Sequence, residues 1–207
     1  MVTEAPIAAG GALGYLGGTF DPIHYGHLLL AEQAREQLGL SRVLFIPSGK
    51  PPHKLTRPVS DAEHRLHMTE LAIRGNDAFE VSSCEIERDG PSYTIATIRE
   101  LKAATGAEIV FITGADSVLD MPMWRMPEAI LSEATVVTFP RPGFDLGRIG
   151  EALGDGLAGR VRVLEGPMIA LSSSDIRARV ARGLSIRYMV PDAVDQYIRA
   201  HGLYRSE

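Results

Sequence analysis

Two histidines, three positions apart, stand in a glycine-rich segment near the N-terminus of this 207-residue chain. The segment reads Gly17-Gly18-Thr19-Phe20-Asp21-Pro22-Ile23-His24-Tyr25-Gly26-His27. Glycines allow a backbone to approach a phosphate group closely, and the free N–H groups at a helix start attract anions. We expect Gly26 to leave room for a triphosphate between the imidazoles of His24 and His27. The pattern therefore predicts a phosphate site that works through histidines.

This segment matches neither of the common phosphate-binding fingerprints. It contains no G-x-G-x-x-G, and the later Ser48-Gly49-Lys50 lacks the remaining residues of a Walker A box. The alternative is that His24 and His27 only cap or pack the helix. Two histidines around a glycine, at a turn between strand and helix, favour the phosphate site.

A second polar cluster lies close to the C-terminus, in the run Leu171-Ser172-Ser173-Ser174-Asp175-Ile176-Arg177. Ser173 and Ser174 can cap a helix and also donate hydrogen bonds to phosphate. Arg177 follows one turn into that helix, where a guanidinium can bind two phosphate oxygens. Taken alone, the run fits a plain capped helix with a solvated arginine equally well.

The elements that position these residues alternate between short apolar strands and helical segments. This order predicts an α/β fold, a doubly wound, Rossmann-like parallel sheet with helices on both faces. The predicted strands are a first strand ending at Tyr15–Leu16, then 43–46, 79–86, 109–112, 136–139 and 161–164. The predicted helices are 26–38, 60–74, 92–105, 127–134, a weak one within 145–157, 174–182 and 191–201.

Ligands of such sheets bind beyond the carboxyl ends of the strands. Both polar clusters follow a predicted strand, so we expect them to meet at that edge. Two helix starts carry capping signals: Ser60 with Glu63 forms a capping box, and Ser92 or Thr94 caps the helix that ends at Gly106.

Composition limits the possible partners and compartments. The net charge of −5 disfavours a protein that binds nucleic acid over its whole surface. Cys84 is the only cysteine, so no internal disulfide can form, and a reducing compartment is favoured. No apolar run is long enough to span a bilayer, and the N-terminus lacks the basic start of a signal peptide. We expect a cytoplasmic protein without a membrane partner, with a flexible leader over residues 1–12 and one domain over residues 13–207. The oligomeric state stays open, a homo-oligomer included.

The two polar clusters closely resemble the two signatures of the H-x-G-H nucleotidylyltransferase superfamily, relatives of class I aminoacyl-tRNA synthetases. The resemblance implies that His27 stabilises the transferring α-phosphate of ATP and that His24 helps to hold the outer phosphates. It also implies that Ser173, Ser174 and Arg177 grip the β- and γ-phosphates. An acceptor phosphate then attacks the α-phosphorus in line, with Mg²⁺ bridging the phosphates through few protein ligands or none. Leu171 and Ser174 replace a more usual isoleucine and threonine and keep the chemistry.

Middle segments bear on the acceptor. Lys54, beside His53, is a cation suited to a phosphate, although the loop could simply be solvated. Thr94 in Pro91-Ser92-Tyr93-Thr94 could bind a carboxylate at a helix start or merely cap it. Trp124 could stack on a flat ring or belong to the core.

Together these segments resemble the bacterial nicotinate-mononucleotide adenylyltransferases, over about residues 16–204. The resemblance implies ATP and nicotinate mononucleotide as substrates, in NAD biosynthesis. The implied ATP side comprises Gly17, Gly18, Thr19, Phe20, Gly26, Gly114, Asp116 at a ribose and Arg141 beside the adenine. The implied acceptor side comprises His53 and Lys54 near the phosphate, Trp124 on the pyridine ring, and Thr94 at the carboxylate with help from the backbone just after Trp124. Tyr93 belongs to the same acceptor side.

Other readings stay open. The acceptor could be nicotinamide mononucleotide or pantetheine phosphate, since no arginine is clearly placed to enforce a carboxylate. A regulator could keep the fold and bind nucleotide without catalysis, although His24, His27 and Arg177 are all present. A nucleic-acid-binding role ranks third, because the chain is acidic and shows no stripe of aromatic and basic residues.

Overall fold

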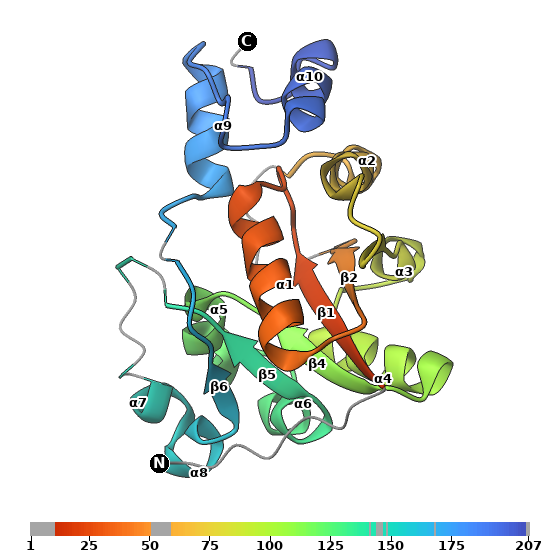
Figure 1. The fold of residues 1–207 in the computed structure, drawn as a ribbon, viewed down its shortest axis with the longest axis vertical. Coiled ribbons are helices and arrows are strands. Elements are labelled where there is room, and N and C mark those ends of the chain that lie inside the picture. Colours follow the sequence, from red (N-terminus) through yellow and green to blue (C-terminus); the bar gives the residue numbers. More distant parts are fainter. Residues whose placement is uncertain are drawn as a thin grey trace.

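The structure is a computed structural model, shown in Figure 1. It describes residues 11–50, 59–140, 142–143, 147, 149–167 and 169–205. Most of the expected leader lies outside these residues. The first strand begins at Ala12, the last residue of the range expected for that leader.

Six strands form one parallel sheet in the order β3-β2-β1-β4-β5-β6. The strands are β1 (Ala12–Gly18), β2 (Arg42–Pro47), β3 (Phe79–Val81), β4 (Glu108–Ile112), β5 (Thr135–Thr138) and β6 (Val161–Val163). The strand order reverses between β1 and β4, so the chain leaves these two neighbours in opposite directions and opens a crevice at their carboxyl ends. The doubly wound fold predicted from the sequence is confirmed.

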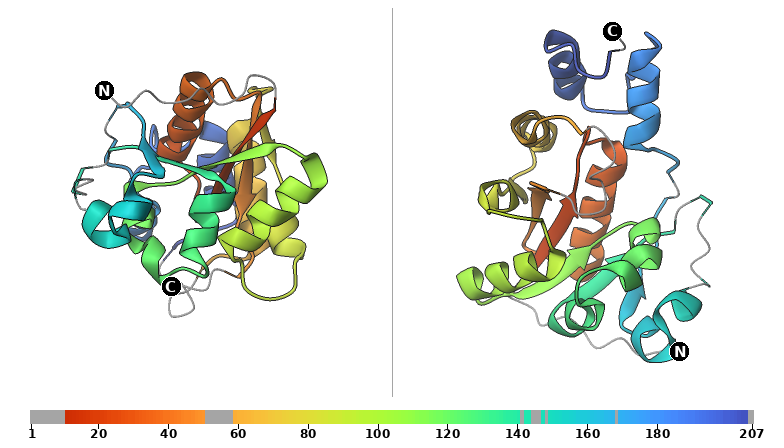
Figure 2. Two further views of the ribbon diagram at one scale, coloured as in Figure 1. Left: turned by 90° about the horizontal axis from the view of Figure 1, so that it is seen from below. Right: turned by 180° about the vertical axis from the view of Figure 1, so that it is seen from behind.

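Helices cover both faces of this sheet (Figure 1 and Figure 2). The helices before β4 are α1 (Tyr25–Leu38), α2 (Ala62–Ile73), α3 (Cys84–Glu87) and α4 (Thr94–Thr105). Those after it are α5 (Ala115–Asp120), the 3₁₀ turn η2 (Met121–Met123), α6 (Pro127–Glu133), α7 (Ile149–Leu153), α8 (Asp155–Ala158), α9 (Ser173–Ala181) and α10 (Asp192–Ala200). α1 and α2 pack on one face and α4 and α6 on the other, while α9 and α10 lie beyond the end of the sheet.

Alternating residues of the central strands build two hydrophobic cores. In β1, Leu16 joins the core beneath α1, whereas Leu13 and Tyr15 join the core beneath α4 and α6. In β4, Val110 and Ile112 face the first core, and their neighbours face the second. Adjacent strand residues point to opposite faces, so continuous apolar strands are what a sheet covered on both sides requires.

Two predicted strand ends are wrong. β1 continues through Gly17 and Gly18, which pair with Ile46 and Pro47 of β2, so these glycines end the strand instead of forming a turn. The strand predicted over residues 79–86 stops at Val81, and the chain then forms α3. The Glu85 carboxylate in α3 accepts hydrogen bonds from Tyr15 and Thr97, and these tertiary contacts override the local alternation.

Both capping predictions are wrong as well. Asp61, not Ser60, precedes α2, and its side chain makes no capping hydrogen bond. Tyr93 precedes α4 without a side-chain cap, because the Ser92 hydroxyl accepts hydrogen bonds from the N–H groups of Gly49 and Lys50 instead. Between β4 and Trp124, where no helix was predicted, the chain forms α5 followed by η2.

The C-terminal segment is bound to the glycine-rich segment by a side-chain hydrogen bond. The Tyr204 hydroxyl donates to Asp21 Oδ1 at 2.7 Å, and Asp21 is only 4% exposed. Burial raises the pKa of the Tyr204 hydroxyl above its ordinary value, and the charge of Asp21 raises it further. Among the described residues, no helix has both the length and the apolar character that crossing a membrane requires.

Replacing Tyr204 with Phe should lower the free energy of unfolding by about 1 kcal/mol near neutral pH, because a buried carboxylate loses a donor. A raised folded pKa gives stability that is complete below the unfolded pKa, about 10, and is lost as pH rises through the folded value. The gap between wild type and Tyr204→Phe should therefore narrow above about pH 10. Urea unfolding from neutral pH to above about pH 10 measures this difference in the free energy of unfolding. Tyr188→Phe, at a residue 79% exposed, is the control. A gap independent of pH would contradict the assignment.

Candidate functional site

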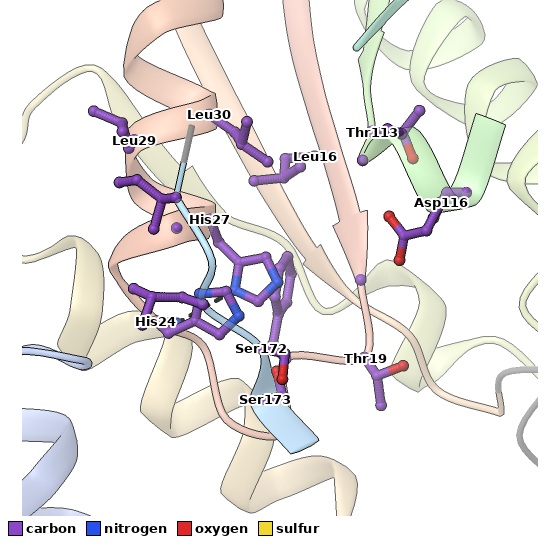
Figure 3. A pocket seen from close by; sticks show the side chains of 18 of the residues that line it. Leu16, Thr19, His24, His27, Leu29, Leu30, Thr113, Asp116, Ser172 and Ser173 are labelled. Atoms are coloured by element: carbon purple, nitrogen blue, oxygen red, sulfur yellow. Dashed lines mark hydrogen bonds between the residues drawn. The ribbon is translucent and has the colours of Figure 1, made fainter. Parts of the chain in front are cut away.

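A cavity of about 330 Å³ opens at the carboxyl ends of β1 and β4, where the strand order reverses. Its walls come from the end of β1, the start of α1, the start of α5 and the serine-rich turn before α9. The two polar clusters that stand about 150 residues apart in the sequence therefore meet in one place, as the sequence predicted. Figure 3 shows this cavity with the paired histidines on one side and Thr113 and Asp116 on the other.

The rings of His24 and His27 stack on each other in this cavity. Their centroids lie 3.7 Å apart at an angle of 22° between the ring planes. The backbone N–H of His24 donates to Nδ1 of His27 at 3.3 Å. Because this nitrogen accepts, the proton of the neutral His27 ring lies on Nε2, which is then a donor. Phe20 holds the same ring edge-on, with centroids 5.0 Å apart.

The predicted reason for Gly26 is wrong. Rings 3.7 Å apart leave no room for a triphosphate between them. A Cβ on Gly26 would lie 3.0 Å from two atoms of the His24 ring, so the missing side chain makes space for that imidazole. Phosphate must therefore approach the edges of the stacked rings and not the gap between them.

The serine-rich turn binds the glycine-rich segment directly. Ser172, not Ser173 or Ser174, caps α9 by accepting from the Asp175 N–H. Ser173 instead donates to the carbonyl of Pro22 at 2.9 Å. Arg177 donates to the carbonyl of Asp21 at 2.7 Å, and its other terminal nitrogen donates to Ser174. Ser173, Ser174 and Arg177 all line the cavity, as predicted, but two of them also fix its opposite wall.

A second cavity, of about 570 Å³, adjoins the first. Gly17, Gly18, Thr19, Thr113, Asp116 and Ser117 line both. The Asp116 carboxylate folds back over the start of α5, where a Cβ on Gly114 would lie 2.5 Å from its Oδ1. A molecule in either cavity would therefore meet Thr19 and Asp116 at the boundary.

The second cavity collects Tyr93, Thr94 and Trp124, which the sequence assigned to an acceptor. The ring centroids of Trp124 and Phe111 lie 6.2 Å apart. Trp124 is half-buried and lines the cavity. Tyr93 and Thr94 form the start of α4, a helix whose first turn carries no acidic residue. The three predicted residues are brought together.

Ser48 and the side chain of Arg125 are among the groups of this second cavity that sequence reasoning missed. Ser48 is 8% exposed, and its hydroxyl has no hydrogen-bond partner within the described part of the chain. Arg125 also lines the cavity, with its guanidinium 4.8 Å from the centre of the Tyr93 ring. A single serine or arginine without a spacing pattern gives no signal in the sequence. The predicted residues His53, Lys54 and Arg141 lie outside the described residues.

Arg65 of α2 ties the loops around both cavities together. It is 2% exposed, and its guanidinium donates to the carbonyls of Thr19, Ser48 and Ser60 at 2.7–2.9 Å. Burial lowers the pKa of this guanidinium, and the charge of Asp21 opposes that shift. Arginine nevertheless stays charged in proteins, so a fixed cation lies behind the glycine-rich segment.

This arrangement is suited to holding two anionic molecules side by side. The first cavity offers donors for phosphate oxygens in the His27 ring, the Arg177 guanidinium and the Ser174 hydroxyl, which accepts from Arg177 and keeps its own proton. The described residues contain no group of three or more His, Cys, Asp or Glu side chains placed to bind a metal ion.

Comparisons with known proteins agree with the geometry. The chain matches the protein family described as Cytidylyltransferase-like over residues 15–179. It is 48% identical over 200 residues to a protein of Moorella thermoacetica named "Probable nicotinate-nucleotide adenylyltransferase", covering 94% of this chain and 92% of that protein. A Roseiflexus protein of the same name is 49% identical over 195 residues, covering 93% and 98%.

A similar fold occurs among solved structures. Plasmodium falciparum nicotinic acid mononucleotide adenylyltransferase complexed with APC superposes with a TM-score of 0.76, covering 94% of this chain and 98% of that one. The two sequences are 16% identical, so this likeness supports the fold alone.

Replacing Arg65 with Met should lower the free energy of unfolding by roughly 2–4 kcal/mol, because several buried carbonyls lose their donors together. Urea unfolding measures the loss. Arg179→Met is the matched control, since Arg179 donates to one exposed carbonyl, that of Ser185. Equal losses in the two variants would show that the buried guanidinium does not hold these loops.

Proposed function

The chain belongs to the Cytidylyltransferase-like family and, within it, to the nicotinate-nucleotide adenylyltransferases, and from this premise we propose the reaction that its site performs. The family resemblance stated from the sequence is thereby confirmed. In the proposed reaction, the chain transfers AMP from ATP to nicotinate mononucleotide. The products are nicotinate adenine dinucleotide and pyrophosphate, a step of NAD biosynthesis.

One observation carries the proposal: two cavities share a wall at Thr19 and Asp116, beside the paired histidines. Direct transfer between two bound phosphates needs both of them in reach of each other, and holding them so lowers the barrier. We place ATP in the first cavity and the acceptor in the second. Their reacting phosphates then meet at the shared wall.

The acceptor phosphate is the nucleophile in this mechanism. One of its oxygens forms a bond to the α-phosphorus of ATP, and the bond from that phosphorus to the bridging oxygen breaks. Pyrophosphate leaves with the electron pair, so no covalent enzyme intermediate forms. Catalysis consists mainly of positioning and of neutralising charge.

The hydrogen bond from the His24 N–H to His27 gives His27 its role. With Nδ1 occupied as an acceptor, Nε2–H is the donor available to the α-phosphate oxygens. His24 stacks on the His27 ring and keeps that ring in place. We assign His24 itself to the outer phosphates. Ser173, Ser174 and Arg177 stabilise the charge of the departing pyrophosphate.

We propose that Mg²⁺ accompanies ATP and neutralises part of its phosphate charge. Magnesium keeps several waters and binds through phosphates with one or two carboxylates. The Asp116 carboxylate and the Thr19 hydroxyl, both at the shared wall, are oxygen ligands of the kind it accepts. The remaining ligands would be phosphate oxygens and water.

In the second cavity, Trp124 offers a ring face to the pyridine and the start of α4 offers N–H groups to its carboxylate. Ser48 is the buried hydroxyl suited to the ribose or phosphate of the same acceptor. His53, Lys54 and Arg141 keep the roles that the family resemblance implies. A cytoplasmic location fits a chain with one cysteine.

Pyrophosphate release in the presence of ATP and Mg²⁺ tests the proposal directly. Nicotinate mononucleotide should support rapid release, because its ring, carboxylate and phosphate each have a place in the second cavity. Nicotinamide mononucleotide should be poorer, and pantetheine phosphate should be inactive, because it has no ring to stack on Trp124. Pyrophosphate release with pantetheine phosphate alone would show that nicotinate mononucleotide is not the acceptor. The absence of release with all three compounds would refute the proposed reaction.

Replacing His27 with Ala should lower kcat by at least roughly 10²–10³, the loss seen when one donor to a developing charge is removed. KM should change much less, since the ring acts mainly in the transition state. Steady-state kinetics measure both constants. His67→Ala, at an exposed histidine of α2 outside both cavities, is the control. A kcat within a few-fold of wild type would exclude His27 from the chemistry.

A further inference from the structure

We propose that Arg125 is the residue that selects the acceptor by the charge of its ring substituent, favouring a carboxylate over a neutral amide. The inference rests on the proposed function and adds to it a residue that no sequence motif marks. It concerns substrate choice and not the transfer step. The N–H groups at the start of α4 can donate to either substituent, and the positive end of the helix dipole adds only a small preference for the charged one.

The acidic residues around the second cavity oppose the binding of a carboxylate, so a preference for the acid needs a cation. Its lining residues include three acidic ones, Glu85, Asp116 and Asp120. Arg125 is the basic side chain among the described residues of this lining. Without a cation, a carboxylate entering here would meet three acidic groups and would bind less well than an uncharged amide.

A ring contact places this cation beside the start of α4. The Arg125 guanidinium lies 4.8 Å from the centre of the Tyr93 ring, within the range of a cation–π contact. Tyr93 is the residue that precedes α4, and Thr94 is the first residue of the helix. Trp124 is adjacent to Arg125 in the chain, and all four side chains line the same cavity. A ring stacked on Trp124 therefore has the cation and the helix start within one small region.

The Arg125 guanidinium also forms no ion pair within the described part of the chain. Arg88 and Arg99, on the same side of the sheet, form ion pairs with Glu100 and Glu133. No acidic side chain of the described residues pairs with Arg125, which instead contacts the neutral Tyr93 ring. An arginine held by an aromatic ring keeps its donors available for a carboxylate.

A comparison of two acceptors isolates this interaction. Nicotinate and nicotinamide mononucleotide carry the same phosphate, ribose and ring, and differ only in the charge of the substituent. The ratio of their kcat/KM values therefore cancels every effect on phosphate binding or on transfer. What remains is the response of the cavity to one negative charge.

The experiment measures this ratio in wild type and in Arg125→Gln, Arg125→Lys and Arg125→Glu. Arg125→Gln should lower the preference for the acid by roughly five- to tenfold, the range between an exposed ion pair and a charged hydrogen bond. Most of the loss should lie in the constants for the acid. Arg125→Lys should keep part of the preference, because the charge remains without the planar fork. Arg125→Glu should favour the amide.

A matched control is available elsewhere on the surface. Arg187 also rests on a tyrosine, with its guanidinium 5.4 Å from the centre of the Tyr188 ring, and it lies outside both cavities. Arg187→Gln should leave the ratio unchanged. Tyr93→Leu provides a second variant. It removes the ring under Arg125 but not the arginine itself, and it should lower the ratio of the two kcat/KM values.

Ionic strength gives an independent readout. Added salt screens an exposed charge pair, so the wild-type ratio should fall as salt rises, while the ratio of Arg125→Gln should stay flat. A ratio in Arg125→Gln within twofold of wild type, or equal losses with both acceptors, would overturn the proposal. Failure of the proposed function appears separately, as wild type that releases no pyrophosphate with nicotinate mononucleotide.

Discussion

The buried guanidinium of Arg65 is the interaction on which the site depends most. Thr19 and Ser48 directly follow β1 and β2, and Ser60 lies just before α2. Within the described part of the chain, no backbone N–H donates to the carbonyls of these three residues, which accept from Arg65. A buried carbonyl without a donor is costly, and one planar cation with five N–H groups satisfies all three at once. The segments that flank both cavities are thus held at fixed separations by a residue that touches neither.

Side chains also hold the other side of the glycine-rich segment through hydrogen bonds. Ser173 and Arg177 bind the carbonyls of Pro22 and Asp21, and Tyr204 binds the Asp21 carboxylate. Three hydrogen bonds from the last 35 residues therefore hold a turn that follows the first strand. The first cavity is closed only when both ends of the chain have folded, so its shape depends on the C-terminal helices.

Much of this was predictable from the sequence, and the errors have physical causes. Apolar strands between helical segments indicated the sheet, and the paired histidines and the serine-rich turn indicated the phosphate site. The strand expected over residues 79–86 failed because the Glu85 carboxylate is bound by Tyr15 and Thr97, a contact between distant segments. Ser92 failed as a cap because Gly49 and Lys50 occupy its hydroxyl. Such long-range contacts leave no local pattern, and so the buried Arg65 and the cation at Arg125 were also missed.

The two cavities draw on different parts of the chain, and this separation bears on how the site is specialised. In the proposed mechanism, transfer chemistry depends on the histidine pair and the serine-rich turn, from the two ends of the chain. Acceptor recognition would depend on Ser48 and on residues 92–94 and 123–125, which lie in connections of the central sheet. Among the described residues, the two cavities share Gly17, Gly18, Thr19, Thr113, Asp116 and Ser117. The side chains that read the acceptor can therefore change without disturbing the phosphates, as long as the shared wall keeps the two molecules in line.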